Sequence, residues 1–68
     1  MEKLNMTPHQ QRVIDEQAEL NEKLTKLYSF LETSLFNSLD ENEKGRLKRQ
    51  SVIMQSYFDI LGERISAF

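Results

Sequence analysis

The sequence predicts an all-α fold: an antiparallel helical hairpin, joined by a short helical turn, that assembles into a homo-oligomer. Two segments carry apolar residues at alternating steps of four and three, the spacing of a helix that packs against another helix. The 68 residues include only two glycines and one proline, so few residues favour turns. A single helical domain over residues 1–68 follows, because domains typically span roughly 50–250 residues.

The first long helix is expected over residues 8–32, after a flexible lead-in over residues 1–6 that shows no periodicity. Thr7 can cap free N–H groups, and Pro8 suits the first helical position, where its missing N–H costs nothing. A further apolar strip beside the seam (Ile14, Ala18, Tyr28) is expected to widen the buried face. The seam itself is aliphatic except for one glutamine: Val13, Gln17, Leu20, Leu24, Leu27 and Leu31.

The connection is expected over residues 33–39, as a short helical turn whose Leu35, Phe36 and Leu39 close one end of the hairpin. The S-x-x-E pattern of residues 38–41 matches a capping box, so the last helix is expected over residues 39–67. Its seam repeats the four-three spacing: Leu47, Ser51, Met54, Phe58, Leu61, Ile65 and Phe68.

A second apolar stripe on the last helix, formed by Ile53, Tyr57 and Ile60, lies off this seam and continues to Arg64. A two-helix hairpin covers one stripe per helix, so the second stripe needs another subunit. Oligomerisation is also the remaining way to stabilise so small a core. The chain has no cysteine for disulfides and one histidine, which is too few for a zinc site built from histidines.

Composition excludes several functional classes. The formal net charge of −2 gives no positive field that would draw the chain onto DNA or RNA. No apolar run approaches the roughly 20 residues of a membrane span. We find no phosphate-binding glycine loop, HExxH zinc motif or catalytic triad pattern. The sequence therefore predicts a protein that is not an enzyme and needs no cofactor or metal; the absence of cysteine suits the cytoplasm.

Several charged residues remain open to two interpretations. His9 and Arg12 stand at the start of the first helix, where free N–H groups favour an anion. A guanidinium suits phosphate and an imidazole can stack on a base, although an exposed histidine at a helix start needs no ligand. Lys23 and Lys26 each follow a glutamate by four residues and can form ion pairs. Arg64 interrupts an apolar stripe and can lie in an interface.

The densest positive run is residues 44–49, with four cations in six residues: Lys44, Arg46, Lys48 and Arg49. Such a run can meet phosphates. It follows Asp40, Glu41 and Glu43 at helical spacing, however, and is equally typical of a solvated helix face.

The stretches PHQQRVIDEQAELNEKLTKL and YFDILGERISAF resemble a family of small phage proteins, the anti-CBASS sponges, over nearly the whole chain from Thr7 to Phe68. These proteins sequester the cyclic oligonucleotide signals of bacterial CBASS immunity. The resemblance implies a homo-hexamer in the cytoplasm of the infected host. It also implies ligand pockets at subunit interfaces, with different sites for cyclic dinucleotides and cyclic trinucleotides.

Carried over residue by residue, the resemblance implies a cyclic dinucleotide site with His9 and Lys23, the lysine against phosphate. It places Arg64 in the cyclic trinucleotide site. The histidine departs from the tyrosine of relatives, which puts the strength of base stacking in doubt. Position on the helices adds Arg12 and Lys26 to the dinucleotide site and Thr25 to the trinucleotide site.

The residues alone also fit a different class of protein. A helical oligomerisation or adaptor module would use the stripe of Ile53, Tyr57 and Ile60 to dock on another phage or host protein. Bound cyclic oligonucleotide would distinguish the two classes.

Overall fold

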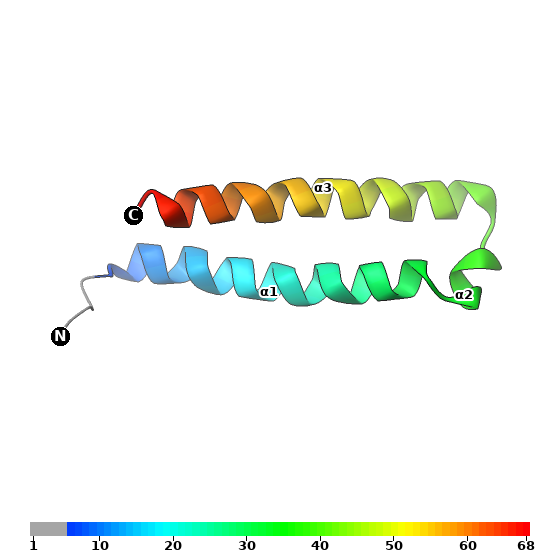
Figure 1. Cartoon of the computed structure of the whole chain (residues 1–68), viewed down its shortest axis with the longest axis horizontal. Coiled ribbons are helices and arrows are strands. Elements are labelled where there is room, and N and C mark those ends of the chain that lie inside the picture. The colour runs from blue at the N-terminus through cyan, green and yellow to red at the C-terminus, as the bar shows by residue number, and fades with distance from the viewer. Residues whose placement is uncertain (1–5) are drawn as a thin grey trace.

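A computed structural model of the chain describes residues 6–68, so residues 1–5 of the expected lead-in lie outside the described residues. Two long helices, α1 (Pro8–Leu31) and α3 (Glu41–Ser66), are joined through a single turn of helix, α2 (Ser34–Asn37). Figure 1 shows α1 and α3 antiparallel and side by side, with α2 at the closed end of the hairpin. The predicted all-α hairpin with a helical connection is confirmed.

α1 begins where the sequence predicts. The Thr7 hydroxyl oxygen accepts a hydrogen bond from the Gln10 N–H (3.1 Å), and the Gln10 side-chain oxygen accepts one from the Thr7 N–H (3.0 Å). This reciprocal pair is a capping box, which satisfies N–H groups that a helix start leaves free. Pro8 follows in the first turn, so its fixed φ angle favours the helical backbone from the start.

α3 begins two residues later than predicted, at Glu41, and the expected capping box does not open it. Ser38 instead closes α2, donating its hydroxyl hydrogen to the Leu35 carbonyl (2.6 Å). Asp40 is the N-cap, and its carboxylate accepts a hydrogen bond from the Glu43 N–H (2.7 Å). Aspartate and serine cap about equally well, but only the carboxylate adds a negative charge that the helix dipole stabilises.

Both long helices end one residue before the predicted limit, α1 at Leu31 and α3 at Ser66. Glu32 and Ala67 are the C-caps, and their N–H groups turn back onto carbonyls of the preceding turn. The hairpin therefore keeps the predicted layout with shifted boundaries.

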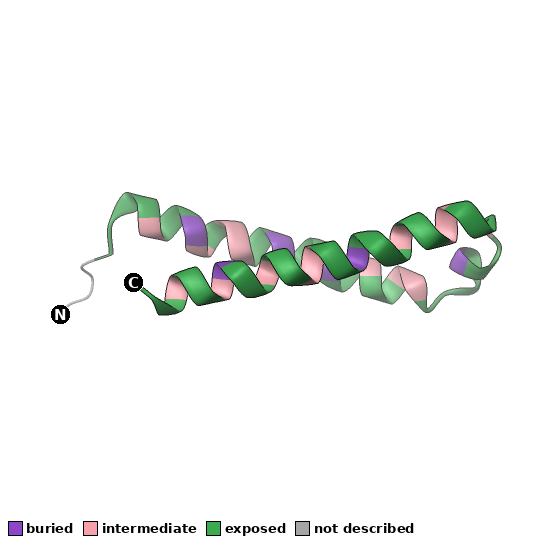
Figure 2. Ribbon diagram, turned by 90° about the horizontal axis from the view of Figure 1, so that it is seen from above, coloured by how far each residue is buried: buried purple, intermediate pink, exposed green. Residues whose placement is uncertain are grey.

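The core follows the two predicted seams. Val13, Leu20 and Leu61 form one buried cluster, against which half-buried Met54, Phe58 and Ile65 pack. Figure 2 shows buried and half-buried positions recurring along both long helices, separated by exposed residues. Burial of these seams is the main favourable term for a hairpin this small.

Four side chains that were expected to be buried are exposed: Ala18, Tyr28, Leu35 and Phe68. The first two belong to the strip beside the α1 seam, where only Ile14 is half-buried. One partner helix covers a single stripe, which explains the narrower face. A single turn such as α2 likewise offers one side to the hairpin: Phe36 is buried and packs edge-on against Phe30 (ring centroids 6.1 Å apart), while Leu35 points away from the core.

Two polar contacts across the hairpin fix which flanks of the helices share a face. The Gln17 side-chain amide donates to the Phe58 carbonyl (3.4 Å), and the Tyr28 hydroxyl donates to the Gln55 side-chain oxygen (2.9 Å). We call this side the Tyr28 face. The opposite side carries Ile53, Tyr57 and Ile60 of α3, and we call it the Tyr57 face.

The two glycines of α3 give a matched test of this packing. A Cβ at Gly45 would have nothing within 4 Å, so Gly45→Ala is expected to raise the free energy of unfolding by about 1 kcal/mol and the melting temperature by roughly 4–8 °C. A Cβ at Gly62 would lie 3.2 Å from Gln17 Nε2, so Gly62→Ala should gain less. Thermal melts measure both. A larger gain from Gly62→Ala would contradict the close approach of α1 and α3 at Gln17.

Candidate ligand-binding site

The predicted site residues lie along the whole hairpin, and all are exposed. His9 and Arg12 lie in the first turns of α1, and Arg64 lies in the last turn of α3. Because the helices are antiparallel, these three residues share the open end of the hairpin (Figure 1). Thr25 and Lys26 lie in the second half of α1, towards the closed end.

His9 and Lys23 do not meet within one chain. They are fourteen residues apart on the same straight helix, which corresponds to about 21 Å at a rise of 1.5 Å per residue. A single ligand that touches both side chains would therefore need His9 of one protomer and Lys23 of another.

Helical periodicity assigns the α1 residues to faces of the hairpin. At about 100° per residue, Arg12 and Lys23 lie about 20° apart, on the flank of α1 that belongs to the Tyr57 face. Thr25 lies about 160° from Lys23, on the flank with Tyr28. Arg64 belongs to the Tyr57 face, so the structure does not bring Thr25 and Arg64 of one chain together.

The predicted ion pairs of α1 do not form. In the described part of the chain, neither Glu19–Lys23 nor Glu22–Lys26 comes within 4 Å. Exposed pairs of this kind gain only a few tenths of a kcal/mol and lose side-chain entropy on forming. The Lys23 ammonium group is therefore not held by a carboxylate within residues 6–68, and it points from an exposed position on the Tyr57 face.

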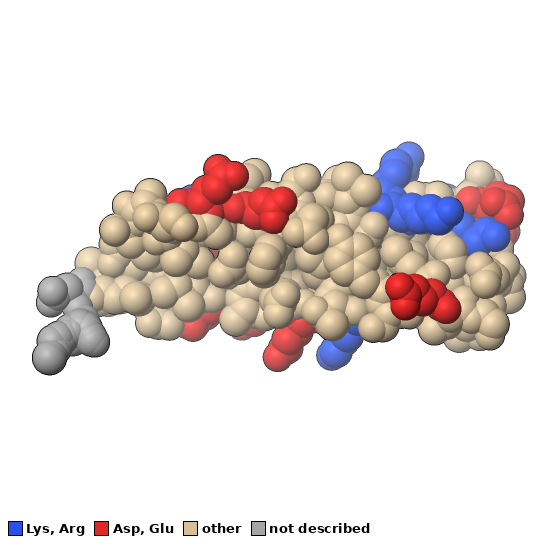
Figure 3. All heavy atoms as spheres, in the orientation of Figure 1, with Lys and Arg blue, Asp and Glu red and all other residues tan. Residues whose placement is uncertain are grey.

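Most of the positive run in α3 is matched within the chain. Lys44 pairs with Glu41 (3.0 Å), and Arg46 pairs with Glu43 (2.8 Å). The Lys48 ammonium lies 5.9 Å from the centroid of the Phe36 ring, within reach of a cation–π interaction. Figure 3 shows Lys and Arg gathered on α3 near the closed end, beside acidic residues. This arrangement favours the interpretation of a solvated, charge-balanced face.

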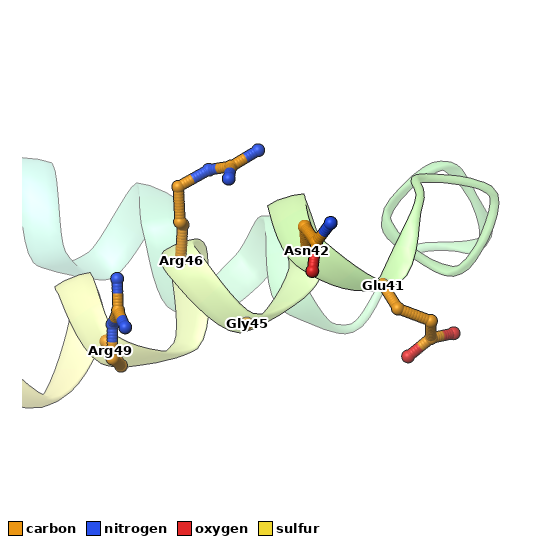
Figure 4. A pocket seen from close by; sticks show the side chains of 5 residues that line it. All are labelled: Glu41, Asn42, Gly45, Arg46 and Arg49. Carbon is orange, nitrogen blue, oxygen red and sulfur yellow. The ribbon is translucent and has the colours of Figure 1, made fainter.

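Arg49 is the one cation of this run with no such partner in the described residues. It lines an open hollow with Glu41, Asn42, Gly45 and Arg46. Figure 4 shows all five residues on α3, with the Arg46 and Arg49 side chains on one side of the helix and Glu41 away from them. A hollow built on one helix is a single wall, and a closed pocket would need a second surface.

A similar hollow on α1 is lined by Asn21, Glu22, Thr25 and Lys26. Two of these residues were predicted to bind different ligands: Thr25 the cyclic trinucleotide and Lys26 the cyclic dinucleotide. Because it too lies on one helix, the isolated chain presents half of a site at most.

Among the described residues 6–68, no side chain covers the second stripe of α3, as the sequence predicts. Ile53, Tyr57 and Ile60 are 67%, 41% and 53% exposed. The stripe and Lys23 lie on the same face of the hairpin, so an apolar surface stands beside a cation that makes no ion pair in the described part of the chain. Sequence reasoning assigned the stripe and the lysine separately and did not relate them. Alignment of the α1 seam with the α3 seam in the sequence could have shown that the stripe and Lys23 share a face.

The structure adds two findings on other classes of site. Among residues 6–68, no three His, Asp or Glu side chains gather closely enough to hold a metal ion. None of the described helices combines the length and apolarity that crossing a membrane requires.

Comparison with protein families finds that the profile of the Sequestin family matches residues 7–67. Comparison with curated proteins and with solved structures finds no match. The family match covers all three helices and both predicted sites.

Proposed function

We propose, because this chain belongs to the Sequestin family of phage anti-CBASS cyclic-nucleotide sponges, that it binds and sequesters cyclic dinucleotides and cyclic trinucleotides without converting them. The observation that carries the proposal for this chain is the Lys23 ammonium, which makes no ion pair within residues 6–68, beside the exposed stripe of the Tyr57 face. Tight binding alone removes a signal from its receptor. The proposed function therefore needs positively charged side chains for the phosphates and aromatic side chains for the bases, and it needs no catalytic group.

The proposed active form is a homo-oligomer, with a hexamer as the proposed size, in the cytoplasm of the infected bacterium. Packing of the Tyr57 face against another copy would bury Ile53 and Ile60 and enclose Lys23 between the two copies. A symmetric interface presents each residue twice, and a cyclic dinucleotide carries two phosphates in near two-fold symmetry. Two copies of Lys23 would then meet two phosphates through charge-assisted hydrogen bonds.

We propose that the remaining site residues come from different protomers of the oligomer. His9 and Arg12 of one protomer would approach Lys23 and Lys26 of a neighbour in the dinucleotide site. Thr25 of one protomer would approach Arg64 of another in the trinucleotide site. The proposal includes no DNA, RNA, membrane, cofactor or metal.

Thermal melting with ligand tests the proposal. Cyclic di-AMP or cyclic di-GMP is expected to stabilise the protein by RT ln(1 + [L]/Kd), so the melting temperature rises with ligand concentration. The linear dinucleotide should stabilise it much less, because it loses more conformational freedom on binding. Ligand extracted after heat denaturation should be intact. Recovery of a cleaved product would identify an enzyme and contradict sequestration.

The exposed apolar stripe also favours a second candidate function, an adaptor that docks on another protein through Ile53 and Ile60. An adaptor needs no nucleotide. A melting temperature that is unchanged by every cyclic di- and trinucleotide, in a protein that remains folded, would favour the adaptor.

A further inference from the structure

We infer that Tyr57 is a ligand-binding residue, whose ring stacks on a base of the cyclic dinucleotide held by Lys23. This inference deepens the proposed function and rests on it. It concerns a residue that neither the sequence motifs nor the family match assigns to a site.

The packing of the seams sets the height of Lys23 along the hairpin. A Cβ on Gly62 would touch the Gln17 amide, and the same amide donates to the Phe58 carbonyl, so Gln17 lies against the turn of α3 from Phe58 to Gly62. Lys23 lies six residues further along α1. Since α3 runs the opposite way, Lys23 lies level with residues 52–56. Tyr57 therefore lies within about one helical turn of the level of Lys23.

Both side chains also belong to the same face. Lys23 lies on the flank of α1 opposite to Gln17 and Tyr28, whose hydrogen bonds define the Tyr28 face. By the helical period, Tyr57 lies on the flank of α3 opposite to Gln55. A cation and an aromatic ring thus lie on the same exposed face, within about one helical turn of each other.

Neither group is engaged within the described residues. Lys23 has no ion pair there, and the Tyr57 hydroxyl makes no hydrogen bond there, whereas the Tyr28 hydroxyl bonds to Gln55. A nucleotide presents a phosphate and a base together, which matches an ammonium beside a ring face. His9 lies about 21 Å along α1 from Lys23, so Tyr57 is the aromatic side chain of the same protomer that can serve this ligand.

Tyr28 provides a matched control, because both tyrosines are 41% exposed and they lie on opposite faces. The full chain is titrated with cyclic di-AMP and cyclic di-GMP by calorimetry, with oligomer size measured for each variant. Tyr57→Leu removes the ring and should weaken binding roughly 5- to 100-fold, the range that corresponds to loss of one stacked base. Tyr57→Phe keeps the ring and should bind within about twofold of wild type, while Tyr28→Leu should leave affinity unchanged.

A fluorescence measurement covers the case in which Tyr57→Leu disturbs the oligomer. The chain has no tryptophan, so Tyr57→Trp and Tyr28→Trp each introduce a single tryptophan, whose emission is measured under excitation that the remaining tyrosine does not absorb, and each keeps an aromatic ring. Bound ligand should quench the emission of the Tyr57→Trp variant and leave that of the Tyr28→Trp variant unchanged.

Three results would overturn the stacking role. The first is wild-type affinity in Tyr57→Leu, the second is an equal loss of affinity in Tyr57→Leu and Tyr57→Phe, and the third is equal quenching of the two tryptophan variants. Wild type that binds while Tyr57 proves neutral would leave the proposed function standing. Wild type that binds no cyclic dinucleotide would contradict the proposed function and this inference with it.

Discussion

Ile60→Asp is expected to abolish the oligomer. Ile60 is half exposed in the single chain and lies on the Tyr57 face, which the proposal buries against another copy. A carboxylate there would lose its hydration in an apolar interface, and an ion pair with Arg64, four residues along α3, does not repay a cost of several kcal/mol. Sedimentation should show dissociation, and circular dichroism should show whether the freed protomer keeps its helices.

Leu35→Asp is the matched control for this substitution. Leu35 is also an exposed aliphatic residue, but it lies on α2 at the closed end of the hairpin, away from the stripe. The variant should keep the wild-type size, because its carboxylate stays in water. A wild-type chain that is itself a well-folded monomer at micromolar concentration would contradict the proposed interface.

Lys23→Ala is expected to weaken cyclic dinucleotide binding while the oligomer stays whole. Lys23 lies off the α1 seam and is exposed, so its removal leaves the core intact. Loss of one charge-assisted hydrogen bond costs about 1.5–3 kcal/mol, which is roughly 10- to 100-fold in affinity. Lys44→Ala is the control, since it removes the same charge from a residue that is paired with Glu41.

Arg64→Ala completes the same comparison, because the proposal places Arg64 in the trinucleotide site. Calorimetry of both variants with a cyclic dinucleotide and a cyclic trinucleotide gives four affinities. Lys23→Ala should mainly affect the dinucleotide, and Arg64→Ala the trinucleotide. Oligomer size must be measured alongside, because Arg64 borders the stripe. Equal losses for both ligands in both variants, with the oligomer intact, would replace the two sites by one shared pocket.

The seams and the start of α1 could be predicted because they depend on local rules. Four-three spacing identifies the buried sides of α1 and α3, and the Thr7–Pro8 pair identifies a helix start. The start of α3 was wrong, since Ser38 and Asp40 are both good caps and their competition depends on how α2 closes. Burial of Tyr28 was wrong because one partner helix covers a single stripe. Burial of Phe68 was wrong because α3 ends at Ser66, so Phe68 lies beyond the helical part of the seam.

The candidate site was less accessible to sequence reasoning. The family resemblance proposes Lys23 and Arg64 as site residues, and this stays a prediction; spacing along one helix cannot say which residue of the other helix lies level with them. The register of α1 against α3 depends on the packing of Gln17 against Gly62. This register brings Tyr57 near Lys23. The ion pairs of α1 were wrongly predicted, because i,i+4 spacing permits a pair whose net free energy is close to zero in water.

Native mass spectrometry with a panel of cyclic di- and trinucleotides tests the central claim most directly, because it measures subunit number and bound ligand in one experiment. Sequestration at interfaces predicts a homo-oligomer that carries intact cyclic nucleotide, with fewer ligands than subunits. A monomer that binds none of the panel, or an oligomer that releases cleaved nucleotide, would contradict it.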